Sequence, residues 1–406
     1  MLLAMAWRNL WRRPARTWLS VASMAFASAL LVFMLSFQLG SYATMKSNAL
    51  KIFDGYAQIQ PKGYADDPDV RKTIEAPEAL VKQVEAVPGV TAAAPRASSY
   101  VILANGEVSY GAAIAGVDPA REPRVSTIAG TVRQGRYLKS GDAGSIILGD
   151  VLAKNLGVKL GDQITLLGSA ADGTIAADSL RLVGVFHTGI AELDGQVAEM
   201  PLARFQEDFA LGDAVNLIAL VGRDLPAVNR QLGALRAIAE PHALVVQDWG
   251  ALQPGMKQAI TLDFSTGLLW YASLVVVVAF IILNTLLMSV LERTREFGML
   301  LAIGMRSDRI GAMMWAELVL LALIGNGLGI LVGGAVSLWF AAHGIAFSGL
   351  EGLLAQWGLP GRLYPEISPA SILSGPLAII ASIALGGLFP FLRIRRLRPV
   401  EAMGAA

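Results

Sequence analysis

A short charged segment between two long apolar runs is the part of this chain whose residue types could perform a specific task. It spans residues 292–304 and reads Glu-Arg-Thr-Arg-Glu-Phe-Gly-Met-Leu-Leu-Ala-Ile-Gly. Glu292 and Glu296 stand one helical turn apart, and Gly304 can end a helix in the left-handed conformation. We therefore predict a helix that lies along the inner face of a membrane. An ordinary solvated loop between membrane helices is the alternative that these residues leave open.

No residues stand in the spacing of a catalytic, nucleotide-binding or metal site. The sequence lacks the Gly-Lys pair of a P-loop and the Gly-x-Ser-x-Gly of a nucleophile elbow. Its histidines, His187, His242 and His343, are scattered without ligand spacing, and no carboxylates form an evident acid–base pair. We therefore expect a non-catalytic chain with no cofactor or metal of its own.

The composition indicates a membrane protein with a soluble portion. The chain has 406 residues, of which 54% are hydrophobic and 16% charged, and it contains no cysteine that could form a disulfide. Four apolar runs are long enough to cross a bilayer. The predicted spans are residues 18–40, 267–291, 312–341 and 371–392. A cleaved signal peptide is the alternative for the first run, although that run is long for one.

The amino-terminal residues 1–17 are predicted to form an amphipathic helix in the membrane interface, because apolar side chains and arginines fall largely on opposite faces. Its interface anchors are expected to be Trp7, Arg8, Trp11, Arg12 and Arg13.

The distribution of arginines predicts the orientation of the spans. Arginines cluster before the first span, between the second and third, and after the fourth, whereas residues 342–370 contain only Arg362. By the positive-inside rule, both termini and the connection 292–311 are cytoplasmic. Residues 41–266 and 342–370 are then outside the cell membrane, and the tail 393–406 is inside.

The outer segment is expected to be a folded α+β domain inserted between the first and second spans. Strand–helix–strand patterns near both of its ends predict a membrane-proximal α/β subdomain formed by residues 41–97 and 201–266. The β-rich residues 98–200 form an inserted subdomain, in which Asn105-Gly106 predicts a two-residue hairpin turn. The second pattern includes a helix that opens at Asp224 and continues to about residue 239. The fold class is therefore an α-helical membrane protein with four transmembrane helices and a large extracytoplasmic α+β domain.

Three glycines of the third span, Gly325, Gly329 and Gly333, recur at every fourth residue. Such a pattern predicts a face on which another helix packs closely, and glycines tolerated on a lipid-facing surface are the alternative.

Four separated stretches resemble the permease subunits of ABC transporters of the FtsX/MacB/Lol (mechanotransmission, type VII) superfamily, and most resemble its lipoprotein-releasing LolC/LolE branch. They are residues 6–13 with 16–17, residues 292–298 with 302–304, the third span with its glycines, and residues 396–403. In the outer segment, Gly116-Val-Asp-Pro119, Leu148-Gly-Asp150 and Val183-Gly-Val-Phe186 resemble the periplasmic core domain of MacB. The chain lacks the fused ATPase domain of the MacB branch.

The resemblance implies that this chain transmits force from a partner. Two permease protomers, identical or related, are expected to sit on two copies of a separate ABC ATPase that holds the ATP and magnesium. The coupling helix would comprise Glu292, Arg293, Arg295, Glu296, Phe297, Gly298, Met299, Leu300, Ile303 and Gly304. Further expected partners are membrane lipid and a periplasmic lipoprotein carrier or adaptor protein, with no nucleic acid.

The resemblance implies extraction or release of lipoproteins from the inner membrane. The alternatives are MacB-like export of a peptide, lipid or drug with an adaptor and an outer-membrane channel, and FtsX-like regulation of a cell-wall hydrolase. A membrane-anchored receptor that works without ATP is a remote further alternative.

Overall fold

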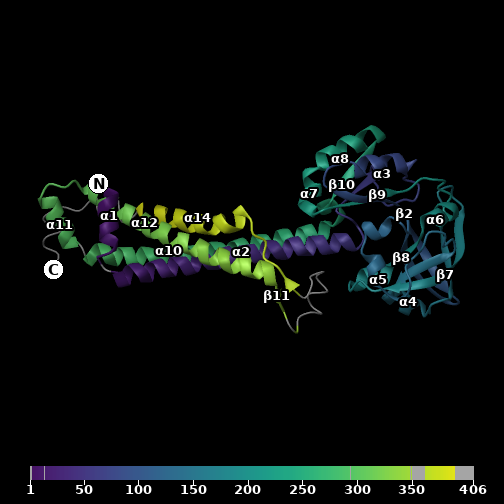
Figure 1. Ribbon diagram of the computed structural model, residues 1–406, viewed down its shortest axis with the longest axis horizontal. Coiled ribbons are helices and arrows are strands. Elements are labelled where there is room, and N and C mark those ends of the chain that lie inside the picture. The colour runs from purple at the N-terminus through teal and green to yellow at the C-terminus, as the bar shows by residue number, and fades with distance from the viewer. Residues whose placement is uncertain (1, 13, 293, 348, 350–361, 389–406) are drawn as a thin grey trace. The chain divides into compact units, whose positions relative to one another are not determined.

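The computed structural model describes residues 2–12, 14–292, 294–347, 349 and 362–388 (Figure 1). The predicted tail 393–406 and the predicted site residues Arg13 and Arg293 lie outside them. The chain forms two compact units. A helical unit contains the residues up to Ala43 and most of those from Ala259 onward, and an α/β unit contains Thr44–Gln258.

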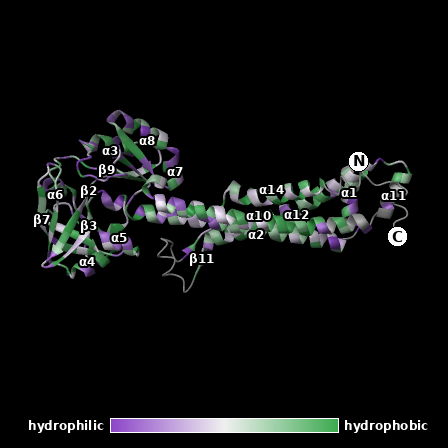
Figure 2. Ribbon diagram, turned by 180° about the vertical axis from the view of Figure 1, so that it is seen from behind, coloured by the Kyte–Doolittle hydropathy of each residue, from purple (hydrophilic) through white to green (hydrophobic). Residues whose placement is uncertain are grey.

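The helical unit is built from long apolar helices with two short helices beside them. The elements are α1 (Leu2–Leu10), α2 (Pro14–Ile52), α10 (Pro254–Glu292), α11 (Thr294–Ala302), α12 (Ser307–His343), α14 (Pro369–Gly386), β11 (Ile345–Ala346) and β12 (Arg362–Leu363). Four of these helices, α2, α10, α12 and α14, are long and apolar enough to cross a membrane, as predicted. Figure 2 shows that hydrophobic residues dominate their length.

Two of the long helices extend well beyond the predicted spans. Helices α2 and α10 have 39 residues each. At ~1.5 Å per residue each is about 58 Å long, roughly twice the ~30 Å thickness of a hydrocarbon core. The hydropathy of the sequence identifies only the apolar part of each helix. The prediction therefore missed the polar continuation of α2 to Ile52 and the start of α10 at Pro254. Pro254 stands at the first position of α10, where its missing N–H costs no helical hydrogen bond.

The helices α2 and α10 are joined by polar contacts as well as by apolar packing. Tyr42 Oη donates to Asp263 Oδ2 at 2.5 Å, and Tyr271 Oη donates to Gln38 Oε1 at 2.6 Å. Buried apolar side chains from α2, α10, α12 and α14 form the core of the unit, among them Met24, Ile282, Leu318 and Ile383.

The α/β unit contains one ten-stranded mixed sheet, in the order β10-β1-β9-β2-β3-β8-β5-β7-β4, with β6 pairing to β2 and β7. Its strands are β1 (Ala57–Pro61), β2 (Val90–Asn105), β3 (Val108–Val117), β4 (Val132–Gly135), β5 (Ser145–Gly149), β6 (Gln163–Ser169), β7 (Ile175–Phe186), β8 (Val197–Pro201), β9 (Leu217–Gly222) and β10 (Leu244–Asp248). Its helices are α3 (Pro77–Glu85), α4 (Asp150–Leu156), α5 (Ala191–Gln196), α6 (Leu202–Asp208), α7 (Leu225–Arg230), α8 (Leu232–Ala239) and α9 (Trp249–Leu252), with 3₁₀ turns η1 (Glu122–Arg124), η2 (Ile128–Thr131) and η3 (Glu240–His242).

Strand β2 belongs to two hydrophobic cores. Ala93, in its first half, packs in a core with residues from both ends of the unit, such as Ile59 and Leu220. Leu103, in its second half, packs in a core with inserted residues such as Leu148. The division that we predicted near residue 97 therefore falls inside a single long strand.

The local structure of the α/β unit follows turn and capping chemistry. The predicted hairpin is confirmed, but its turn lies one residue further on: Asn105 pairs with Val108, and the turn residues are Gly106, with a φ of 60°, and Glu107. Asp224 accepts a hydrogen bond from Ala227 N at 2.7 Å and begins a helix, as predicted. That helix breaks at Gln231 into α7 and α8, which the sequence pattern did not indicate.

Candidate functional site

Helix α11 carries the predicted coupling segment and exposes apolar side chains. It ends just before Gly304, whose φ of 96° lies in the left-handed region expected for a helix-ending glycine. Ile303 is 85% exposed and Met299 is 52% exposed, whereas Gly298 is buried. Met299 lies in the short amphipathic helix and Ile303 directly follows it, and such an exposed pair of large apolar residues is suited to binding a groove on another protein. The structure does not describe the side chains of three further predicted coupling residues, Arg295, Phe297 and Leu300.

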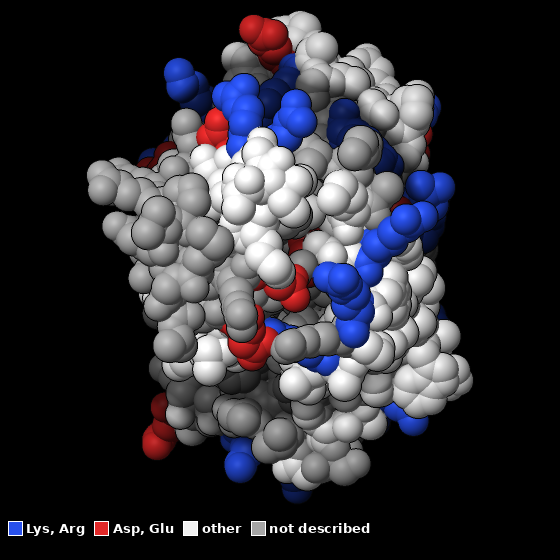
Figure 3. All heavy atoms as spheres, turned by 90° about the vertical axis from the view of Figure 1, so that its left-hand side faces the viewer, with Lys and Arg blue, Asp and Glu red and all other residues white. Residues whose placement is uncertain are grey.

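Ion pairs connect the segment around α11 to the amino-terminal part of the chain. Arg16 lies 3.0 Å from the Glu292 carboxylate, and Arg12 lies 3.8 Å from that of Glu296. Figure 3 shows positively and negatively charged side chains next to one another near the centre of the face that it views. Because the pairs are partly or largely solvent-exposed, each contributes only ~0–1 kcal/mol, so their main effect is orientation.

The corner between α1 and α2 is fixed by a buried hydrogen bond, which Thr17 Oγ1 donates to Leu10 O at 2.5 Å. Trp7 and Trp11 of this corner are about half exposed and their rings meet edge to face. Arg8 and Arg12 are exposed. Half-exposed tryptophans beside exposed arginines are typical of a membrane interface.

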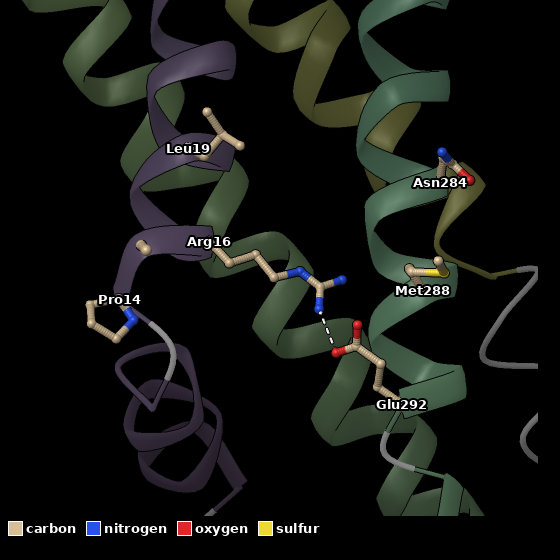
Figure 4. Close-up of a pocket in the computed structure, with 7 residues that line it drawn as sticks. Pro14, Arg16, Leu19, Asn284, Met288 and Glu292 are labelled. Carbon is tan, nitrogen blue, oxygen red and sulfur yellow. Dashed lines mark hydrogen bonds and ion pairs between the residues drawn. The ribbon is translucent and has the colours of Figure 1, made fainter. Parts of the chain in front are cut away.

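A groove lies between the start of α2 and the end of α10. It has a volume of about 600 Å³ and is lined by Pro14, Ala15, Arg16, Leu19, Asn284, Met288 and Glu292. In Figure 4 the Arg16 side chain crosses from α2 toward Glu292 at one end of the groove, Leu19 and Asn284 flank the other end, and Met288 lies between Asn284 and Glu292. The groove thus combines apolar walls with one charged end.

The three predicted packing glycines of α12 lie against α2. A Cβ atom on Gly325 would stand 2.6 Å from Met24 Cβ, and one on Gly333 would stand 2.8 Å from Ala29 Cα. For Gly329 the distance to Ala25 O would be 2.7 Å. Contacts under 3.0 Å are essentially never made by real Cβ atoms, so only glycine allows this approach of the two helices.

The α/β unit holds a buried charge network at the point where α2 ends. Arg96 donates to both carboxylate oxygens of Glu122, at 3.0 and 2.5 Å, and to the backbone carbonyl of Phe53 at 2.5 Å. The guanidinium also stacks over the Phe53 ring, 4.6 Å from its centroid. Arg96 and Glu122 are almost completely buried, so each supplies the charge that the other requires.

A second carboxyl of this network is held in its neutral form. Glu199 is fully buried, and Tyr137 Oη donates to its Oε2 at 2.9 Å. Burial, with a further contribution from the Glu122 charge, raises the pKa of Glu199 to about 8. Nearby, Gln253 Nε2 donates to Asp54 Oδ2 at 2.5 Å, which links the residue before α10 to the segment after α2.

Sequence reasoning missed two groups of residues that the fold brings together. One is the Arg96 network, and the other is a cluster of Asp150, His187 and Asp194. Arg96 and Glu122, like Asp150 and His187, are brought together by the fold from separate elements, so no local spacing identified them. Asp150 and His187 each directly follow a strand, β5 and β7.

The fold defines a class of protein, namely a multi-pass membrane protein with an α/β domain between its first and second spans. Two family models match the chain: the MacB-like periplasmic core domain over residues 17–235 and the FtsX-like permease C-terminal domain over residues 269–399. The chain belongs to the family of ABC-type permeases that combine these two domains.

Full-length relatives carry names from one branch of this family. The chain is 25% identical over 402 residues to the lipoprotein-releasing system transmembrane protein LolC of Neisseria meningitidis serogroup B, covering 95% of this chain and 93% of that protein. It is 25% identical over 403 residues to LolE of Haemophilus influenzae, with the same coverage. Among solved structures, the periplasmic region of MacB from Actinobacillus actinomycetemcomitans matches 50% of this chain and 94% of that one, with 14% identity and a TM-score of 0.36.

Proposed function

We propose that this chain is the permease subunit of an inner-membrane ABC transporter that releases lipoproteins. The observation that carries the proposal is full-length similarity to two lipoprotein-releasing transmembrane proteins, which covers 95% of this chain. A separate ATPase subunit would bind and hydrolyse ATP with magnesium. This chain would convert that cycle into movement of its outer α/β domain.

The proposed contact with the ATPase is α11. Its exposed Ile303 and Met299 would enter an apolar groove of the ATPase, and the charged residues around α11 would set its orientation. The ion pairs Arg16–Glu292 and Arg12–Glu296 support this role, because they join α2 to α10 and α11. The pair Arg16–Glu292 orients α2 against α10, and the pair Arg12–Glu296 orients α11 against the turn that precedes α2.

We propose that the substrate does not cross the membrane through a polar channel between the helices. The described membrane helices carry few ionisable side chains, which disfavours a hydrated route through them. The groove between α2 and α10 has apolar walls and one charged end at the proposed cytoplasmic side, so it can accept a membrane lipid of that leaflet with its polar group beside Arg16. A second permease protomer, identical or related, would complete the transporter.

Export of a non-lipid substrate, in the manner of a MacB-like system, is the second candidate, since the outer domain matches the MacB-like model. It is the weaker of the two candidates, because two lipoprotein-releasing relatives each cover 95% of this chain.

The test is release of lipoproteins from spheroplasts in which the chain can be depleted. With the chain present and a soluble lipoprotein carrier added, newly made lipoproteins are expected to appear in the soluble fraction. On depletion they should remain in the inner membrane, and re-expression should restore release. If release continues after depletion while export of a soluble peptide or drug stops, the substrate assignment is wrong.

A further inference from the structure

Two carboxylates and an imidazole meet at one edge of the α/β unit, outside the proposed coupling site. Asp150 begins α4 directly after β5, His187 directly follows β7, and Asp194 lies in α5. Strands β5 and β7 are parallel neighbours, so their carboxyl ends bring Asp150 and His187 to the same edge of the sheet. His187 Nδ1 lies 2.8 Å from Asp150 Oδ2 and 3.3 Å from Asp194 Oδ2.

The surrounding loop holds Asp194 in place. Asp194 is 1% exposed, and its carboxylate accepts hydrogen bonds from Thr188 N at 2.9 Å, Thr188 Oγ1 at 2.7 Å and Gly189 N at 3.2 Å. A ligating carboxylate is commonly oriented by such outer hydrogen bonds. These donors orient the Asp194 carboxylate from the loop side, and its Oδ2 faces His187.

Asp150 supplies an independent indication that a cation belongs here. Its Oδ1 atom is buried, and within the described part of the chain it has no hydrogen-bond partner. A buried carboxylate oxygen without a partner is costly. The contact with His187 occupies only Oδ2, whereas a cation bound through both oxygens of Asp150 would also satisfy Oδ1.

We propose that Asp150, His187 and Asp194 bind a divalent transition metal, with zinc as the best match. One imidazole nitrogen and two carboxylate oxygens form a set of ligands that zinc accepts, with water in the fourth position. A tetrahedral zinc with bonds of ~2.0–2.2 Å places its ligand atoms about 3.4 Å apart. The separation of 3.3 Å already matches this value, that of 2.8 Å would have to widen by about 0.6 Å, and all the ligand atoms lie within 4.8 Å of one another.

The site leaves room for the fourth ligand. The side chains of His187 and Asp150 are 47% and 40% exposed, so water and the ion can reach them from solvent. The metal would connect the ends of β5 and β7 to α5 and so hold together the edge of the inserted subdomain. This role is independent of the proposed coupling to an ATPase.

The experiment is a metal titration of the full chain purified in detergent, after treatment with a chelator and its removal. We expect one Zn²⁺ per chain by calorimetry, a higher melting temperature with Zn²⁺ than without it, and visible absorption bands when Co²⁺ is used as the probe. His187→Ala should weaken Zn²⁺ binding by at least about 100-fold, beyond the ~10–100-fold typical of losing an outer-shell partner. Asp150→Asn should weaken it at least about 10-fold.

The matched control is His242→Ala, which removes an exposed histidine of the same unit and should leave Zn²⁺ affinity unchanged. Both site variants alter partly exposed side chains, and their melting temperatures without metal will show that they fold. The proposal is overturned if the wild-type chain binds no stoichiometric Zn²⁺, or if His187→Ala binds it as tightly as wild type. An effect of His187→Ala on melting temperature without any response to Zn²⁺ would instead establish a plain ion pair.

Discussion

At the scale of single residues, one buried arginine helps to hold the end of α2 in the α/β unit. Arg96 binds the Phe53 carbonyl, stacks on the Phe53 ring and forms a two-point pair with Glu122. Removing one partner of such a buried pair typically costs ~3–5 kcal/mol, because it leaves the other charge without compensation. Arg96 is therefore suited to hold the residues that follow α2 rigidly against strand β2.

The neutral Glu199 predicts an unusual dependence of stability on pH. Its pKa is raised from 4.5 to about 8 in the folded chain, so between these values the folded state holds a proton that the unfolded state has released. This contribution to the free energy of unfolding is therefore complete below about pH 4.5 and is lost as the pH rises toward 8, by up to ~1.4 kcal/mol per pH unit.

The check is the melting temperature of the purified chain from pH 5 to pH 8, compared with that of Glu199→Gln. The variant keeps an acceptor for Tyr137 and cannot ionise, so wild type should lose stability relative to it as the pH rises. Parallel melting curves for the two chains across this range would contradict a neutral Glu199.

At the scale of elements, the close approach of α2 and α12 organises the helical unit. Gly325, Gly329 and Gly333 allow it, because a side chain at any of them would meet α2 at less than 3.0 Å. Helices that pack this closely gain van der Waals contacts that larger residues would prevent. A movement of α2 is thus expected to carry α12 with it.

We predict that Gly329→Val forces α2 and α12 apart. Overpacking commonly costs ~1–3 kcal/mol, and here the contacts include the α2 backbone, which cannot rotate away. The expected result is a lower melting temperature and a smaller monodisperse fraction in detergent. Gly327→Val is the control, since a Cβ at Gly327 meets nothing within 4 Å. Equal behaviour of the two variants would show that the glycine face does not fix the helix pair.

The elements also show which features of the fold could be predicted from the sequence and which could not. Apolar length identified the four long helices, and turn chemistry identified the helix start at Asp224 and, to within one residue, the hairpin turn after Asn105, because each depends on neighbouring residues. The continuity of β2 through two cores depends on tertiary packing and was missed. Arg96 and Glu122 are 26 residues apart, and Tyr137 and Glu199 are 62 apart, so their pairing follows from the fold alone.

At the scale of the whole molecule, the arginine bias predicts which side of the membrane each unit faces. The chain has no cysteine, so single cysteines can report orientation without a background. A cysteine at Asn105 should react with an impermeant thiol reagent in cells whose outer membrane has been permeabilised, because it lies in an outer hairpin. A cysteine at Ser307 should react only after lysis. The reverse pattern would invert the orientation and remove α11 from the cytoplasm.

The central claim at this scale is that α11 couples the chain to a separate ATPase. It is tested most directly by affinity purification of the tagged full chain in mild detergent, with mass spectrometry and an ATPase assay of the retained material. Wild type is expected to retain an ABC ATPase with activity. Ile303→Asp should no longer retain the ATPase, because a carboxylate cannot enter an apolar groove. The control Ile175→Asp, which alters an exposed isoleucine of the α/β unit, should still retain it. If Ile303→Asp retains the ATPase at the wild-type level, the assignment of α11 is contradicted. If no ATPase is retained by the wild-type chain in several detergents, the coupling itself is contradicted.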